Sequence, residues 1–460
     1  MKLVPIDMPP GIVIKGTDRQ SAGRYRDANL TRFYEGSTGP VGGWRKRSKT
    51  PVSGAGREML SWRDNSGSLW AAIGTHTGLH VMTLSGVMHD VTPSGFTAGR
   101  QDSQNGGGYG QGVYGAGAYG LPIVGVSNVI PASVWSFDVF GENLVGVMEG
   151  DGKIYEWAPS GTPTAANVVA NAPIDCTAII VTAERTLVAL GAEGNPRRVK
   201  WSDNEDNTVW APSATNQAGE FDIKTQGRLC CGMALQNGFI AFTDTDVHRF
   251  DYIDSQLVYG TQLEGDGSGV ISQNAAVMTD GRVFWMGPEG FWTYTGFVSP
   301  LPCDISEEVF KNINRSQLAK VSSVYNSSFG EIWWFYPSGN SLENDRVAVY
   351  SVTERHWNVH RLGRLCGSDR DPFPKPLMLG VDGHVYDHET GVNHGDEKAF
   401  LLSGPVEIGD GDSVIDIMAY IPDEATLGQV DISFLSKYYP NEDAFVSAPY
   451  DANATTDLRT

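Results

Sequence analysis

Three pairs of histidines with four-residue spacing have the residue type that most directly binds a metal ion. On a helix, this spacing places two imidazoles on one face, where they can hold zinc. On a strand, the rise of about 3.3 Å per residue separates the two rings by about 13 Å, and one ion cannot bridge them. We expect strands here, and therefore no metal site and no cofactor at the pairs His76/His80, His356/His360 and His384/His388.

Two acidic stretches are candidates for carbohydrate chemistry, and the second of them, at 201–210, is also a candidate calcium loop. They are SWRDNSGSLW at 61–70 and WSDNEDNTVW at 201–210, and both resemble slightly the aspartate box of sialidase propellers, which is a structural turn. A glycosidase needs two carboxylates about 5 to 9.5 Å apart, or a tyrosine nucleophile with arginines that hold an acidic sugar. Nothing in the sequence singles out such a pair. We therefore expect solvated or calcium-stabilised turns, no catalytic residues and no enzymatic activity.

A glycine-rich stretch at 106–120, GGGYGQGVYGAGAYG, contains two overlapping matches to the dinucleotide fingerprint G-x-G-x-x-G. That fingerprint binds a phosphate only between a strand and the N-terminus of a helix, and neither pattern flanks this stretch. We predict a flexible projecting loop, with tyrosines at five-residue steps that contact a neighbouring protein. The glycines of the two matches are Gly110, Gly112, Gly115, Gly117 and Gly120, and the tyrosines are Tyr109, Tyr114 and Tyr119.

The composition indicates a folded protein that does not grip nucleic acid. Of the 460 residues, 40% are hydrophobic and 19% are charged, which is enough apolar material for a packed core. A net charge of −20 repels a phosphate backbone, although it is compatible with a conduit through which DNA slides. We find no signal peptide and no apolar run long enough for a membrane helix. The five cysteines are expected to be reduced thiols in a protein made in a cytoplasm.

Short apolar runs joined by tight turns dominate the chain and predict antiparallel strands. Around these turns the apolar residues alternate with period two, as in EIWWFYP at 331–337. A single helix is indicated in DISEEVFKNIN, with Asp304 and Glu307 as a capping box. Six dipeptides have the composition of hairpin turns: Ser66-Gly67, Ser85-Gly86, Asp151-Gly152, Asn237-Gly238, Asp280-Gly281 and Asp382-Gly383.

Similar strand-turn-aromatic blocks recur about every 40 to 57 residues, which is in the range of propeller blades. Seven such blocks begin near Glu58, Ser133, Asp175, Gly232, Ser272, Lys320 and Pro376. We therefore predict an all-β protein with a β-propeller-like body of short antiparallel blades at 51–400, interrupted by a Gly/Tyr-rich insertion at 100–125. Residues 1–50 form an N-terminal arm, and residues 401–460 form a small C-terminal β-module that we expect to be incomplete.

Several stretches in order along the chain resemble the tail nozzle, or tail-hub, proteins of short-tailed bacteriophages. They include the stretch at 9–48 that ends in GWRKRS, the Gly/Tyr loop, SFDVFGENLVGV at 136–147, RRVKWSDNEDNTVW at 197–210, residues 267–303 and SSFGEIWWFYPSG at 327–339. The resemblance covers most of the chain and carries no catalytic signature. The C-terminal module after Leu401 is shorter than the family pattern.

The resemblance implies a structural virion protein of the phage tail, made in the cytoplasm of the bacterial host. It implies a homohexameric ring below the portal and adaptor proteins, next to tail fibres or a tail spike or needle, with DNA ejected through the lumen. We expect the basic clusters Arg45-Lys46-Arg47 and Arg197-Arg198 to face subunit or adaptor interfaces. Two alternatives stay open: a carbohydrate-binding or glycan-cleaving propeller of a phage tail or bacterial surface, and an adhesin without catalysis.

Overall fold

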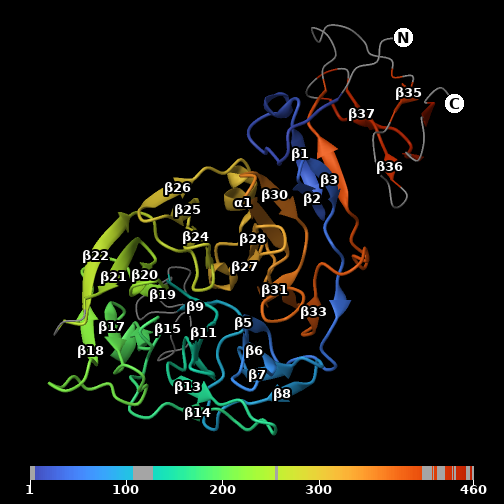
Figure 1. Cartoon of the computed structure of the whole chain (residues 1–460). Helices are drawn as coiled ribbons and strands as arrows, with labels where there is room; N and C mark the ends of the chain where they lie inside the picture. Colours follow the sequence, from blue (N-terminus) through green and yellow to red (C-terminus); the bar gives the residue numbers. More distant parts are fainter. Residues whose placement is uncertain are drawn as a thin grey trace, which may run out of the picture.

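A computed structural model describes residues 6–106, 128–253, 257–406, 417, 419–421, 430–437, 439, 442–451 and 456–457. Seven four-stranded antiparallel sheets follow one another along the chain and are arranged around a common axis, as Figure 1 shows. The last sheet contacts the first through β31 (Arg364–Ser368) and β5 (Gly56–Arg63), so the circle is closed. The fold is a β-propeller, as predicted, and it has seven blades.

The first four blades are meanders in which each strand pairs with the next. Blade one adds β6 (Leu69–Thr75), β7 (Gly78–Thr83) and β8 (Met88–Asp90) to β5. Blade two consists of β11 (Trp135–Phe140), β12 (Asn143–Met148), β13 (Ile154–Trp157) and β14 (Asn167–Val168). Blade three consists of β15 (Ala178–Val181), β16 (Leu187–Leu190), β17 (Arg198–Trp201) and β18 (Gly219–Asp222). Blade four consists of β19 (Leu229–Ala234), β20 (Phe239–Thr243), β21 (Asp246–Tyr252) and β22 (Tyr259–Asp266).

Blades five and six follow the same order, and blade seven departs from it. Blade five consists of β23 (Ala276–Thr279), β24 (Arg282–Met286), β25 (Phe291–Tyr294) and β26 (Val298–Leu301). Blade six consists of β27 (Ser322–Asn326), β28 (Glu331–Tyr336), β29 (Arg346–Ser351) and β30 (Trp357–His360). Blade seven takes β31, β32 (Leu377–Gly380) and β33 (Val385–Asp387) from the end of the body, and β4 (Arg45–Lys46) from the N-terminal segment.

The pairing of β4 with β33 joins the two ends of the body. Lys46 lies opposite Tyr386, and Arg45 lies opposite Asp387. Residues 1–50, which we expected as an arm, therefore contribute a strand to the body. The same segment carries β1 (Tyr25–Asn29), which pairs with β34 (Phe400–Ser403), and the hairpin of β2 (Thr31–Tyr34) and β3 (Ser37–Pro40).

Apolar side chains on both faces of each blade form the core between neighbouring blades. All six residues of β28 are buried, since this strand is covered on both sides. Between blades one and seven, Met59 and Ile73 pack in one cluster with Leu377 and Leu379. This arrangement explains why the strands read as nearly continuous apolar runs.

The glycines of all six predicted turns have positive φ, between 70° and 91°. Asp280-Gly281 is a two-residue hairpin loop between β23 and β24, and both residues have the left-handed backbone of a type I′ turn, with φ of 49° and 71°. Six predicted blocks begin within four residues of a first strand, and the seventh blade begins at Arg364, before the expected Pro376.

The predicted capping box is wrong, although the helix is present. Helix α1 (Ser306–Asn312) has Ile305 at its N-cap and no side-chain cap. Asp304 lies one residue too early to cap it, and its carboxylate instead accepts a hydrogen bond from Lys15 at 2.8 Å. Three 3₁₀ turns are also present, η1 (Asp18–Ser21), η2 (Ala192–Gly194) and η3 (Leu318–Lys320). Among the described residues, no helix is long and apolar enough to cross a membrane.

Two segments leave the propeller. Strands β9 (Gln104–Gly106) and β10 (Asn128–Ile130) pair at the base of the Gly/Tyr-rich insertion, whose three tyrosines lie outside the described residues. After β34, three nested antiparallel pairs form three separate two-stranded sheets, apart from the blades in Figure 1, and we call them together the C-terminal ribbon. They are β35 (Ala419–Tyr420) with β40 (Thr456–Asp457), β36 (Asp431–Ile432) with β39 (Tyr450–Asp451), and β37 (Leu435–Ser436) with β38 (Phe445–Val446).

Candidate functional site

Residues 272–274 lie near one end of the propeller axis. A ligand at this place in a ring-shaped fold can contact several blades at once. This segment links blades four and five, and its polar groups bond to four other blades at the start of their first strands. The Asn274 side chain donates to the carbonyls of Arg57 (2.7 Å) and Trp135 (3.3 Å). Gln273 donates to Thr177 O at 3.2 Å, Ser272 donates to Val321 O at 2.6 Å, and Ser323 N donates to Asn274 O at 2.7 Å.

These bonds hold a segment of the protein's own chain across the first strands of four other blades. Ser272 and Gln273 are both buried, at 5% and 8% exposure. A buried polar donor needs an acceptor, and here the acceptors are backbone carbonyls at the starts of the first strands. The segment is therefore a fixed part of the ring, hydrogen-bonded to four other blades.

A buried ion network beside the axis anchors the insertion. The Arg57 guanidinium contacts Glu343 at 2.9 Å and donates to the carbonyl of Gln101 at 2.7 Å. Lys320 contacts Asp102 at 2.5 Å and Glu343 at 3.2 Å. Both cations are 3% exposed. Gln101 and Asp102 lie shortly before β9, so these contacts tie the start of the insertion to residues of blade one and to the segment before blade six.

Two acidic side chains on first strands have raised pKa values. Burial raises the pKa of Glu58, on β5, to about 8. Burial also raises the pKa of Asp138, on β11, to about 6, although it accepts hydrogen bonds from Val181 N at 2.7 Å and Val139 N at 2.8 Å. Raised carboxyl pKa values are frequent in active sites. In these two residues the cause is burial between blades, and the described contacts do not join them to one another.

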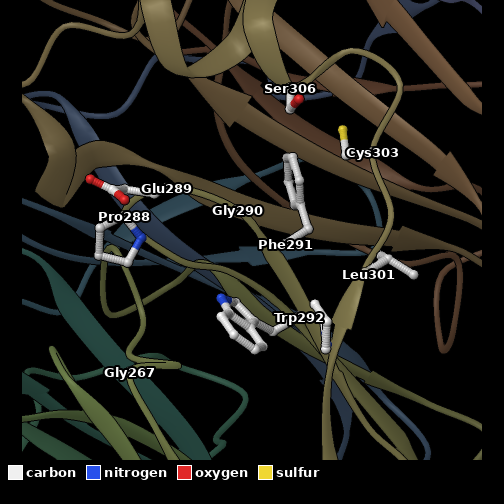
Figure 2. A pocket seen from close by; sticks show the side chains of 10 residues that line it. Gly267, Pro288, Glu289, Gly290, Phe291, Trp292, Leu301, Cys303 and Ser306 are labelled. Atoms are coloured by element: carbon white, nitrogen blue, oxygen red, sulfur yellow. The ribbon is translucent and has the colours of Figure 1, made fainter.

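A shallow pocket of about 470 Å³ lies on blade five, next to the start of α1. In Figure 2 the rings of Phe291 and Trp292, adjacent on β25, border it from two sides, and Cys303 and Ser306 lie beyond the Phe291 ring. Its remaining lining residues are Gly267, Pro288, Glu289, Gly290, Pro300 and Leu301.

The pocket is suited to binding an apolar or flat surface and has few groups for catalysis. Of the described residues that line it, Glu289 is the one carboxylate, and it is exposed at the rim. The thiol of Cys303 is protonated at neutral pH, because burial raises its pKa to about 12. A two-carboxylate hydrolysis requires a second acidic residue opposite the first.

Histidines of the three pairs, which the sequence did not favour as metal ligands, make polar contacts within the body, and two of them contact the N-terminal segment. His360 Nδ1 accepts a hydrogen bond from Leu30 N at 3.1 Å. The rings of His80 and His384 lie 3.1 Å from the hydroxyls of Ser53 and Ser48, respectively. His388 faces Arg364 at 2.9 Å. Among the described residues, no group of three or more His, Cys, Asp or Glu side chains is placed to hold a metal ion.

The two acidic stretches form turns that their own side chains organise. Asp64 accepts from Ser66 Oγ at 2.6 Å, Ser68 N at 2.8 Å and Trp70 Nε1 at 2.9 Å. Burial opposes its ionisation, but these hydrogen bonds hold the pKa of Asp64 below its usual value. In the second stretch Asp206 accepts from the backbone and hydroxyl of Thr208, at 2.9 and 2.6 Å. The carboxylates thus serve the local fold.

The basic clusters differ in how many of their positive charges are paired with carboxylates of the same chain. Arg47 pairs with the buried Asp387, and Arg198 pairs with Glu193 at 2.8 Å and Asp222 at 2.9 Å. Arg45, in contrast, is 75% exposed. Sequence reasoning missed the polar segment at 272–274 and the Arg57–Lys320 network, because single polar residues before a strand carry no periodic signal.

Comparisons with known proteins find no relative in sequence and only distant similarity to solved structures. No protein-family profile matches the chain, and no curated protein is similar to it in sequence. A streptogramin B lyase structure is 10% identical, with a TM-score of 0.42, over 75% of this chain and 96% of that chain. The β-propeller domain of Cps50 (Swd1) from Myceliophteria thermophila is 9% identical, with a TM-score of 0.42, over 75% and 99%. The Pan2 WD40 domain of Neurospora crassa is 10% identical, with a TM-score of 0.42, over 79% and 96%.

Proposed function

We propose that this chain is a structural, non-enzymatic subunit of a short phage tail that assembles into a ring. The observation that carries the proposal is the ribbon of β35–β40, which leaves the propeller with apolar side chains uncovered. Phe445 is 72% exposed, Val446 56% and Leu435 52%. A two-stranded ribbon is marginally stable alone in water, and contiguous exposed apolar residues mark contact sites. Such a ribbon requires a protein neighbour.

The segment at 272–274, which is bonded to four other blades, supports a particular route for DNA in this proposal. Because residues 272–274 bond across one end of the propeller, a DNA path runs between subunits around a common lumen and not through a single subunit. The expected neighbours are the portal-adaptor proteins on one side and tail fibres, or a spike or needle, on the other. The stretches that resemble nozzle proteins, in the same order along the chain, support the same assignment.

Assembly of the purified full-length chain tests this function. We expect closed rings of about six subunits in negative-stain images, and a matching oligomer mass by mass photometry. The chain should also be found in purified virions of the phage that encodes it. A chain that stays monomeric at every concentration, and is absent from virions, would contradict the proposal.

The pocket on blade five favours one second candidate, carbohydrate binding without cleavage. Trp292 offers an aromatic face and Glu289 a hydrogen-bond acceptor at the rim, the combination that a sugar ring can use. A glycan array probed with the full chain and with Trp292→Ala distinguishes this candidate. Binding of a defined glycan that is lost in the variant would support it.

A further inference from the structure

The C-terminal module carries a strong negative charge, which is suited to binding a basic surface. Residues 401–460 contain eleven acidic and two basic side chains, so nearly half of the chain's net charge of −20 is concentrated in 60 of its 460 residues. Asp431 and Asp443 are exposed beside the apolar residues of the ribbon. Leu435 and Val446 lie directly opposite one another on β37 and β38 and therefore share one face. The ribbon thus combines an apolar strip with an acidic rim.

A complementary surface lies at the outer edge of blade seven. We call it the blade-seven edge, and it consists of Arg45, Lys46, Lys49, Val381 and Val392. Strand β4 is the last strand of its sheet, so its outer edge pairs with no other strand among the described residues. Val381 is 63% exposed and Val392 is 82% exposed. Backbone bonds from Gly43 to Gly391 and from Trp44 to Asn393 hold the loop of Val392 next to β4.

The cations of this edge exceed the carboxylates that face them. Arg45 and Arg47 share the single carboxylate of Asp387, and Lys46 lies 3.4 Å from Asp382. Lys49 is exposed one residue beyond the buried Ser48. Together with the neighbouring Arg47, the three cations of the edge therefore face two carboxylates, which makes a positive patch on a strongly acidic protein. On blade three the comparable cations are neutralised, since Arg198 and Lys200 pair with carboxylates of their own sheet.

We propose that the C-terminal ribbon of one copy docks on the blade-seven edge of a second copy, with the ribbon's acidic rim against the cations and its apolar strip against the exposed valines. The two surfaces are different parts of the chain, so the contact is head-to-tail, and repeating it closes a ring when the rotation allows. This inference rests on the proposed ring function and names its interface. Unlike charges at the rim set partner choice and register, and the apolar centre supplies the affinity.

Paired charge reversals in the full-length chain test the contact. The variants are Arg45→Glu/Lys46→Glu, Asp431→Lys/Asp443→Lys and the two pairs combined, with Lys224→Glu/Arg315→Glu as a control on exposed cations elsewhere. Mass photometry over a concentration series gives the concentration of half-assembly. Each pair alone should raise it by at least about tenfold, because like charges meet at the rim. The combined variant should recover most of that loss, and the control should assemble as the wild type does.

A single exposed change, Val392→Asp, keeps the test decisive if a double variant folds poorly. It places a negative charge opposite the acidic rim, and we expect weaker assembly with unchanged circular dichroism and melting temperature. Rings that form normally in Arg45→Glu/Lys46→Glu and in Val392→Asp would overturn this interface and leave the ring function standing. Loss in both charge-reversed pairs without recovery in the combination would also overturn the pairing of these two surfaces. A wild-type chain that never assembles would overturn the interface and the ring together.

Discussion

At the scale of single residues, one buried arginine joins the N-terminal segment to the ring. Arg32, on β2, donates to both carboxylate oxygens of Glu331 at 2.8 Å and contacts Glu389 at 2.6 Å. Its guanidinium also lies 3.5 Å from the centre of the Phe329 ring. All three charged side chains are less than 10% exposed, so neither carboxylate can be hydrated in place of the arginine.

We therefore expect Arg32→Met to lower the free energy of unfolding by about 3–5 kcal/mol, because it leaves two buried carboxylates without a cation. Urea unfolding followed by tryptophan fluorescence measures the change. The matched control is Arg185→Met, which removes an exposed pair with Glu205 and should cost about 0.5 kcal/mol or less. Equal effects of the two substitutions would show that burial of the ion pair does not determine the loss in the free energy of unfolding.

A second residue-scale prediction concerns the pH dependence of stability. The pKa of Glu58 is raised to about 8 in the folded protein by burial, and in the unfolded chain it returns to about 4.3. Between these values the folded state holds a proton that the unfolded state releases, so stability falls as pH rises from about 4 to 8. Glu58→Gln removes the ionisable group and therefore this pH dependence of stability. The variant should gain stability relative to the wild type with rising pH, by about 2–4 kcal/mol at pH 8. Parallel stability curves for the two proteins would contradict a buried neutral Glu58.

At the scale of elements, the two terminal segments have unequal roles in the fold. Strand β4 supplies the outer strand of blade seven, and β1 pairs with β34, whereas the described part of the C-terminal ribbon pairs only with itself. Removal of residues 1–50 should therefore abolish cooperative unfolding, and removal of residues 407–460 should leave the melting transition of the propeller intact. Differential scanning calorimetry of both truncations measures this. A propeller that melts normally without residues 1–50 would show that β4 contributes little to the stability of the closed ring.

The difference between these elements also explains what the sequence could and could not predict. The turn at Asp280-Gly281 and the apolar run of β28 are local patterns, and they predicted blades near their observed positions. Strand β4 has two charged residues and no alternation, and its partner Asp387 lies 342 positions later, so no local signal marks it as part of a blade. The start of the seventh blade was predicted too late for a related reason. The polar stretch before Leu377 separates β31 from the apolar run, so no local pattern marks β31 as the first strand of the blade. Residues 272–274 were missed because their role depends on the closed ring.

At the scale of the whole molecule, the net charge of −20 constrains a DNA conduit. If DNA passes through the ring, its phosphates must slide past the lumen wall without being captured, and each phosphate paired with Lys or Arg would add affinity. Screening at physiological salt confines the field of the wall to about 8 Å, so only lumen-facing residues matter. The exposed cation Arg45 is assigned above to a subunit contact, and Arg47 and Arg198 are paired within the subunit.

We therefore predict that the lumen of the assembled ring is net acidic, with the Arg45-Lys46-Arg47 and Arg197-Arg198 clusters away from the DNA path. A structure of the ring by electron cryomicroscopy decides the placement of these residues. Purified rings should also bind duplex DNA more weakly than about 10⁻⁴ M at physiological salt, the weak limit of ordinary non-specific binding. Affinity that rises steeply as salt is lowered would indicate phosphate contacts with basic residues. A lumen lined mainly by Lys and Arg would contradict the sliding argument directly, because each such residue would hold the DNA that the ring is proposed to release.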